Sequence, residues 1–164
     1  MKKAISLMLG FLICVFSCVI CYAANPDDIP DLKNKFKDSV GPQVNGLSVD
    51  YVSYSPPESE KKLPLVVYFH GKDQGSEPRA QIEENNFVLW ASDEIQSRFS
   101  DGGAYLFVPR SHEENKEYWN DEYVVSVKAA VDDFIEAHKD FIDKTKIYVG
   151  GFSMGGKMTL KMAS

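Results

Sequence analysis

The stretch KIYVGGFSMGGKM, residues Lys146–Met158, decides the fold of this 164-residue chain. It begins with β-branched and aromatic residues typical of a buried strand and continues into a segment that predicts a helix. Between them, Gly151–Gly155 matches the pattern G-x-S-x-G. So short a pattern also arises by chance, but its place between a strand and a helix is the setting of a nucleophile elbow, with Ser153 at the tip.

The elbow predicts a role for each residue around Ser153. Gly151 and Gly155 have no Cβ, so they allow the strand and the helix to approach each other closely. The Ser153 Oγ is then expected at the N-terminus of the helix, where the helix dipole favours developing negative charge. The Met154 N–H is expected to point at an oxyanion formed there.

A second segment fits the same chemistry. LPLVVYFHG, residues Leu63–Gly71, is a continuous apolar run ended by a glycine, which predicts a strand buried on both faces. The loop after His70 and Gly71 is expected to supply a second backbone oxyanion donor, and Lys72 is the residue we assign to it. His70 is expected to brace this loop by hydrogen bonding rather than to act as a base.

The rest of the chain alternates between strand and helix patterns. Further strands are predicted at 46–57, where apolar residues alternate with polar ones, and at 104–109 and 146–151. Helices are predicted at 31–37, 85–99, 121–141, where Asn120 or Asp121 caps the N-terminus, and from 155 onward. This order predicts an α/β fold whose short apolar strands pair in parallel through right-handed crossovers.

These motifs together resemble the N-terminal half of an α/β-hydrolase. The similar stretches are PLVVYFHGKDQG, AYLFVP, Trp119 and DKTKIYVGGFSMGGKMTL. The likeness spans about residues 63–164 and is greatest to secreted serine esterases of the poly(3-hydroxybutyrate) depolymerase, feruloyl esterase and phospholipase/carboxylesterase type. It implies a three-layer sandwich with a mostly parallel central sheet, Ser153 as nucleophile, Met154 and Lys72 as oxyanion donors, and no cofactor.

The acid and the histidine of such enzymes follow the nucleophile in the chain. Residues 154–164 contain neither a carboxylate nor a histidine. His112 is expected to lie at the edge of the sheet that carries Ser153, but as a loop residue, because an isolated histidine without an orienting carboxylate is a poor base. His138 falls on the apolar stripe of the predicted helix 121–141. We therefore expect a domain truncated by on the order of 100 residues, with 146–151 as an exposed edge strand.

The first residues predict a signal peptide. Lys2 and Lys3 precede the apolar run 4–20, and small residues at Ala23 and Ala24 predict cleavage after Ala23. We expect a secreted or periplasmic protein that contacts a membrane only if the leader stays uncleaved. All three cysteines lie in this leader, so the mature chain has no disulfide. The predicted organisation is a signal peptide (1–23), an N-terminal linker (24–45) and part of a hydrolase domain (46–164).

Composition excludes several other classes of function. The formal net charge is −6 and no lysine/arginine cluster is present, which argues against nucleic acid as a partner. GKDQGS is not a P-loop, GGFSMGG is not a dinucleotide-binding fingerprint, and HEENKE has one histidine and so no zinc-ligand spacing. No metal site is predicted.

The sequence leaves three hypotheses open. The first is a carboxylic ester hydrolase in which Ser153 attacks the acyl carbonyl of a small-molecule or polymer-linked ester. The second is a serine peptidase on the same scaffold. The third is a non-catalytic chain, either a relic of such an enzyme or a binding module. No residue of the chain selects the acyl group, the alcohol or the oligomeric state.

Overall fold

A computed structural model of the chain describes residues 29–72, 74–112 and 119–164. Its strands are β1 (Lys37–Val40), β2 (Asp50–Tyr54), β3 (Leu63–Phe69), β4 (Tyr105–Pro109) and β5 (Ile142–Gly151). They form one sheet in the order β1-β2-β4-β3-β5. The predicted signal peptide, residues 1–23, lies outside the described residues.

The sheet is mixed. The three apolar strands pair in parallel, β4 with β3 and β3 with β5, whereas β1 with β2 and β2 with β4 pair antiparallel. Since β3, β4 and β5 run in the same direction, their carboxyl ends meet at one edge of the sheet. The residues after Phe69, Pro109 and Gly151 therefore gather at that edge.

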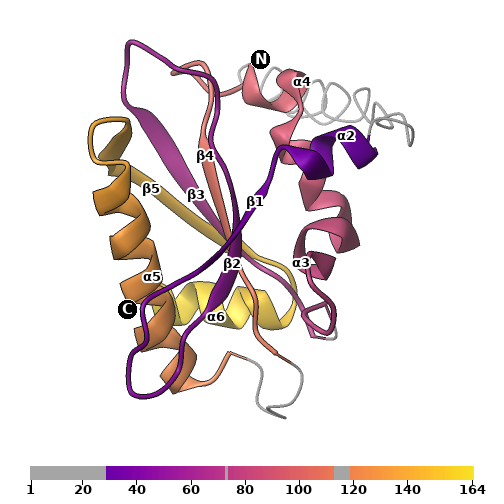
Figure 1. Ribbon diagram of the computed structural model, residues 1–164, viewed down its shortest axis with the longest axis vertical. Helices are drawn as coiled ribbons and strands as arrows, with labels where there is room; N and C mark the ends of the chain where they lie inside the picture. The colour runs from indigo at the N-terminus through magenta and orange to yellow at the C-terminus, as the bar shows by residue number, and fades with distance from the viewer. Residues whose placement is uncertain (1–28, 73, 113–118) are drawn as a thin grey trace, which may run out of the picture.

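Helices cover the sheet on both faces, which gives three layers (Figure 1). They are α2 (Ile29–Asn34), α3 (Ala80–Glu83), the 3-10 helix η2 (Glu84–Ala91), α4 (Asp93–Gln96), α5 (Asp121–Ala137) and α6 (Met154–Met162). In Figure 1, α5 and α6 lie on one face of the sheet and α2, α3 and α4 on the other. No helix among the described residues is long and apolar enough to cross a membrane.

The central strands β3 and β4 are apolar throughout because the side chains of each alternate between two cores. On β3, Leu65, Val67 and Phe69 pack with α5 and α6, whereas Val66 packs on the opposite face with η2. β2 follows the same rule and is almost fully buried. The sequence predicts it as half-buried, since its alternation of apolar and polar residues is typical of a sheet with one solvated face. Here the Tyr51 ring stacks on Phe107 at 4.3 Å.

The structure differs from the predicted helices in their bounds and in one break. The helix predicted at 121–141 ends at Ala137, and the one predicted at 31–37 ends at Asn34. The continuous helix predicted at 85–99 is wrong, because η2 ends at Ala91 and α4 starts at Asp93. Ser92 separates them with an extended ψ of 148°, and its side chain caps α4 by accepting from the Ile95 N–H. Asn120 caps α5 as predicted, accepting from the Tyr123 N–H at 3.1 Å.

Part of the predicted N-terminal linker packs into the domain. Leu32 and Phe36 are buried against the core that η2 covers. β1 adds an edge strand to the sheet, and Arg79 binds Asp38 on it with a shortest N–O distance of 2.5 Å. The arginine also lowers the pKa of the Asp38 carboxyl by hydrogen bonding and by its charge. Residues 29–40 are thus structural parts of the sandwich.

The opposite edge strand, β5, has apolar side chains exposed to solvent. Tyr148 is 54% exposed and Ile147 38%, and on α6 Leu160 is 74% exposed. An apolar groove of about 600 Å³ runs beside β5, between Tyr148 and the aromatic side chains of Tyr68 and Trp90. Such an edge, with unpaired backbone groups and apolar side chains, is a template for pairing with another chain.

The N-terminus of α6 lies very close to the end of β3. A Cβ on Gly155 would lie 2.0 Å from the carbonyl oxygen of Phe69 and 2.7 Å from that of His70. A Cβ on Gly151 would lie 2.5 Å from the Gly155 carbonyl carbon. Only glycine fits at these two positions, because the neighbours are backbone atoms that have no other rotamer to adopt.

We expect Gly155→Ala to lower the free energy of unfolding by about 3 kcal/mol, since an overpacked site must move its backbone. Urea denaturation measures this. Gly156→Ala is the matched control, because its Cβ would meet only the Gly151 carbonyl oxygen at 3.7 Å. It is expected to stabilise the helix by about 0.5–1 kcal/mol. Equal unfolding midpoints for the two variants would contradict the packing described.

We expect Tyr148→Lys to reduce self-association of the chain, because a charge on an exposed edge strand disfavours edge-to-edge pairing. Light scattering as a function of protein concentration measures this. Val125→Lys removes a side chain of comparable exposure, 48%, from α5, and should leave the scattering unchanged. A similar decrease in both variants would assign the effect to net charge rather than to the edge.

Candidate active site

Ser153 lies between β5 and α6 on a strained backbone. Its φ and ψ are 52° and −112°, outside the regions that non-glycine residues normally occupy, and strain of this kind is typical of functional sites. The side chain is exposed and does not cap α6. Met154 is the first residue of α6, so its N–H has no acceptor within the helix.

The turn that holds Ser153 is fixed to the end of β3. The Phe152 N–H donates to the Phe69 carbonyl at 3.0 Å, and the close approach of Gly155 to the same carbonyl adds a second contact. The ring of Phe152 lies against Gly71, where an added Cβ would be 3.0 Å from Cδ1. The structure therefore brings the two predicted segments, 151–155 and 70–72, together.

His70 is fully buried, and both of its ring nitrogens have partners. Nε2 accepts a hydrogen bond from the Ser111 N–H at 3.0 Å. A backbone N–H only donates, so the proton is on Nδ1, which donates to the Gly71 carbonyl at 2.7 Å. The Trp119 indole N–H donates to the His70 carbonyl at 2.9 Å. This arrangement ties the ends of β3 and β4 together, in line with the bracing role expected for His70.

Burial lowers the pKa of His70 to about 4, and the charge of Arg110 acts in the same direction, while the bond to Gly71 opposes both. The ring is therefore neutral at physiological pH. A neutral ring whose two nitrogens are both hydrogen-bonded within the protein is not available as a general base.

Two further residues of this site are not among the predicted ones. The Gln74 side chain accepts from the Gly71 N–H at 2.6 Å, and the Ser111 N–H binds His70. A glutamine four residues after His70, followed by a glycine, is the sequence signal for Gln74. Ser111 has no such signal, because its partner lies 41 residues away.

His112 does not face Ser153. Its Nε2 lies 3.1 Å from an Asp50 carboxylate oxygen, which also binds Arg110 at 2.7 Å. Asp50 belongs to β2, and the sheet order places β2 on one side of β4, with β3 and β5 on the other. The ring thus has an orienting carboxylate that the sequence did not reveal, but the pair lies on the side of β4 away from β5.

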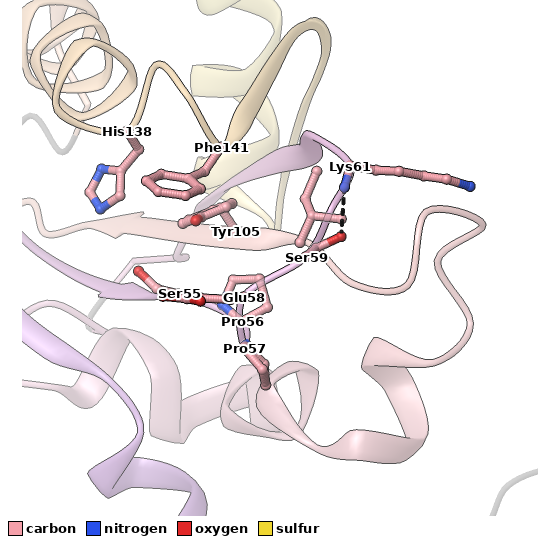
Figure 2. Close-up of a pocket in the computed structure, with 10 residues that line it drawn as sticks. Ser55, Pro56, Pro57, Glu58, Ser59, Lys61, Tyr105, His138 and Phe141 are labelled. Carbon is pink, nitrogen blue, oxygen red and sulfur yellow. Dashed lines mark hydrogen bonds between the residues drawn. The ribbon is translucent and has the colours of Figure 1, made fainter.

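His138 lies at the opposite end of the strands. It follows α5, and its Nδ1 lies 2.9 Å from the Phe134 carbonyl oxygen. Figure 2 shows its ring beside Phe141 and Tyr105, in a pocket of about 240 Å³. Tyr105 begins β4, whereas Ser153 follows the carboxyl end of the parallel strand β5. All three histidines of the chain are therefore placed, and none is positioned to take a proton from Ser153.

Solved esterase structures share this fold. A thermostable esterase superposes with a TM-score of 0.60 at 22% identity over 79% of this chain and 38% of its own. A Pyrobaculum calidifontis esterase superposes with a TM-score of 0.54 at 21% sequence identity, covering 82% of this chain and 42% of its own. The propionate-bound esterase Est2 of the Planctomycetes species Thermogutta terrifontis superposes with a TM-score of 0.53 at 18% sequence identity. The match covers 82% of this chain and 46% of the esterase.

The chain has the α/β-hydrolase fold. It spans between 38% and 46% of the lengths of these three esterases. No protein-family model and no curated protein sequence matches it. The predicted fold class is confirmed, whereas identities of this level carry no information about substrate.

The described residues do not suggest a metal centre. Within 29–72, 74–112 and 119–164, no three or more His, Cys, Asp or Glu side chains gather as metal ligands would. The candidate site consists instead of the strained serine, the N-terminus of α6 and the braced loop after β3.

We expect the stability of the fold to fall between about pH 6.5 and pH 4 because of His70. Its pKa in the folded state is about 4 against 6.5 for the free side chain, so the unfolded chain binds a proton first as the pH falls. The stability linked to this group is complete above pH 6.5. Its loss amounts to at most about 3 kcal/mol.

Urea denaturation from pH 7 to pH 4 measures this effect, with His70→Gln as the test variant. His70→Gln is expected to be less stable at pH 7 and to lack this part of the pH dependence. His138→Gln is the control and should retain it. A His70→Gln curve parallel to that of the wild type would contradict the assignment.

Proposed function

We propose that this chain carries the nucleophile and the oxyanion hole of a serine-dependent carboxylic ester hydrolase. The observation that carries the proposal is the backbone of Ser153, held at a φ of 52° at the N-terminus of α6 and packed against the loop after β3. The fold shared with solved esterases supports it. A strained turn between a strand and a helix presents the serine Oγ to a substrate, which acyl transfer requires.

The proposed reaction proceeds in two steps. Ser153 Oγ attacks the acyl carbonyl carbon and loses its proton to a base, and the carbonyl oxygen becomes an oxyanion. The backbone N–H groups of Met154 and Lys72 stabilise this oxyanion. The alcohol then leaves with a proton from the base, and water releases the acid from the acyl-enzyme by the same route in reverse.

None of the three histidines of these 164 residues is proposed as the base. His70 is buried and bonded through both nitrogens, His112 pairs with Asp50 beyond β4, and His138 lies at the far end of the strands. The resemblance to serine esterases implies an acid and a histidine that follow the nucleophile. Residues 154–164 contain neither.

The substrate class is proposed to be a carboxylic ester, either a small molecule or one linked to a polymer. The proposed location is outside the cytoplasm, secreted or periplasmic, with the leader removed after Ala23. The support for this location is the leader composition, in which two lysines precede an apolar run and small residues follow it.

A fluorophosphonate probe tests the nucleophile, with imidazole added as the missing base. We expect imidazole to accelerate phosphonylation of Ser153, and we expect Ser153 to react at least about 100-fold faster than an ordinary serine, because catalysis by the oxyanion hole survives loss of the triad partners. Mass spectrometry of peptides measures the rate at each site. Ser100, which is exposed, is the internal control.

Ser153→Ala should abolish the fast reaction while Ser100 keeps its own rate. Equal rates at Ser153 and Ser100, with and without imidazole, would refute an activated nucleophile. They would favour the non-catalytic alternative, in which the chain keeps only the fold.

A further inference from the structure

A polar cleft lies between the outer strands β1 and β2 and the start of α3, on the side of β4 away from β5 and Ser153. Its volume is about 330 Å³. A pocket of this size, in which several polar groups converge, is typical of a binding site for a small molecule. The polar side chains that line it are Asp38, Ser39, Asp50, Arg79, Gln81 and Arg110.

Gln81 has an unsatisfied amide oxygen in the wall of this cleft. The residue is only 2% exposed, yet its Oε1 is buried without a hydrogen-bond partner among the described residues. A buried acceptor without a donor is unfavourable, and such groups are uncommon in folded proteins. A ligand in the cleft that donates a hydrogen bond would satisfy this atom.

Arg110 and Asp50 offer both donors and acceptors to the same cleft. Arg110 Nη2 donates to Asp50 Oδ2 at 2.7 Å, which uses one of the five N–H donors of the guanidinium group. The contacts of Asp50 with Arg110 and His112 both involve Oδ2, which leaves Oδ1 as an acceptor. A ligand can therefore form hydrogen bonds with this ion pair without breaking it.

The charges that line the cleft cancel. Arg79 is paired with Asp38, and it also donates to the backbone carbonyls of Lys33 and Phe36. Arg110 is paired in turn with Asp50. A charged ligand would be attracted by one member of each pair and repelled by the other. The cleft therefore favours a neutral ligand that forms hydrogen bonds.

We propose that this cleft binds a neutral polyhydroxylated molecule, a sugar or a cyclic polyol. A hydroxyl group both donates and accepts. Adjacent hydroxyls of such a ligand accept from Arg110 and donate to Asp50, and a further one donates to Gln81 Oε1. The site does not include Ser153, so this binding goes beyond the proposed ester hydrolysis and does not require it.

Heteronuclear NMR of the full chain, titrated with myo-inositol and with D-glucose, tests the binding. We expect saturable shifts of the Asp50, Gln81 and Arg110 amide signals with a Kd on the order of 1 mM, because a few hydrogen bonds offset little of the cost of association. Cyclohexanol has the ring of myo-inositol with a single hydroxyl, and it should bind at least about tenfold more weakly. If neither polyol gave saturable shifts, the proposal would be wrong.

Two further titrations test whether the ligand is neutral. L-Alanine is a zwitterion whose ammonium and carboxylate groups could pair with Asp50 and Arg110, and acetate is an anion that could pair with Arg110 alone. Both should shift the same amide signals less than myo-inositol does at equal concentration. Tighter binding of either one would overturn the assignment to a neutral polyol.

Gln81→Met and Gln96→Met form a matched pair of variants. Gln81→Met keeps the length of the side chain and should weaken polyol binding by about tenfold. Its urea midpoint should not fall, because Oε1 has no described partner to lose. Gln96 is also buried, at 6% exposed, but it donates to the Trp90 carbonyl and accepts from the Ala104 N–H. Gln96→Met should therefore lower the urea midpoint and bind polyols as the wild type does.

Arg110→Lys is a second, independent variant. It keeps the positive charge beside Asp50 but loses the guanidinium fork, and it should also weaken binding of myo-inositol. Wild-type affinity in both Gln81→Met and Arg110→Lys would place any polyol binding elsewhere and refute this site. Phosphonylation of Ser153 should proceed at the wild-type rate in Gln81→Met, so failure of the polyol site and failure of the proposed nucleophile are separate results.

Discussion

The backbone contact between the start of α6 and the end of β3 is the constraint on which the site depends. With 2.0 Å between a Cβ on Gly155 and the Phe69 carbonyl oxygen, α6 can begin there only because that residue has no side chain. The contact sets where the strand must turn, and Ser153 takes up the turn with a positive φ. The same stretch of β3 leads directly into His70 and the loop after β3. One point of contact thus fixes the position of both halves of the proposed oxyanion hole.

Buried hydrogen bonds then make this arrangement rigid. His70 joins the loop after β3 to the residue after β4 through two bonds, and Trp119 joins the start of α5 to the His70 carbonyl. A buried donor or acceptor left without its partner costs about 1–3 kcal/mol, so these bonds resist rearrangement. Rigidity of this kind is what a preorganised oxyanion hole needs, because its donors must already be oriented when the charge develops.

The sequence predicted the parts of the fold that depend on local pattern. Short stretches of sequence were enough to predict the buried strands β3 and β4, the cap at Asn120 and the glycines around Ser153. Each of these features requires particular residue types at neighbouring positions. β1 was not predicted, since KDSV is polar and its place depends on pairing with β2 and on the ion pair between Arg79 and Asp38. The break at Ser92 was missed because an amphipathic pattern does not reveal a single extended residue.

Of the proposed site, the described residues hold the nucleophile and the backbone donors, whereas none of their histidines is placed to act as the base. Placing a nucleophile and two N–H donors requires only backbone geometry, and β3, β5 and α6 supply it through contacts among themselves. A general base requires a titratable ring free to exchange a proton at Ser153, and the surroundings of each histidine prevent this: burial for His70, the Asp50 pair for His112, and the far end of the sheet for His138. The histidine nearest to the site is also the one whose two ring bonds hold the loop, so turning it into a base would release that loop. Bracing the oxyanion hole and accepting the proton must therefore belong to different residues.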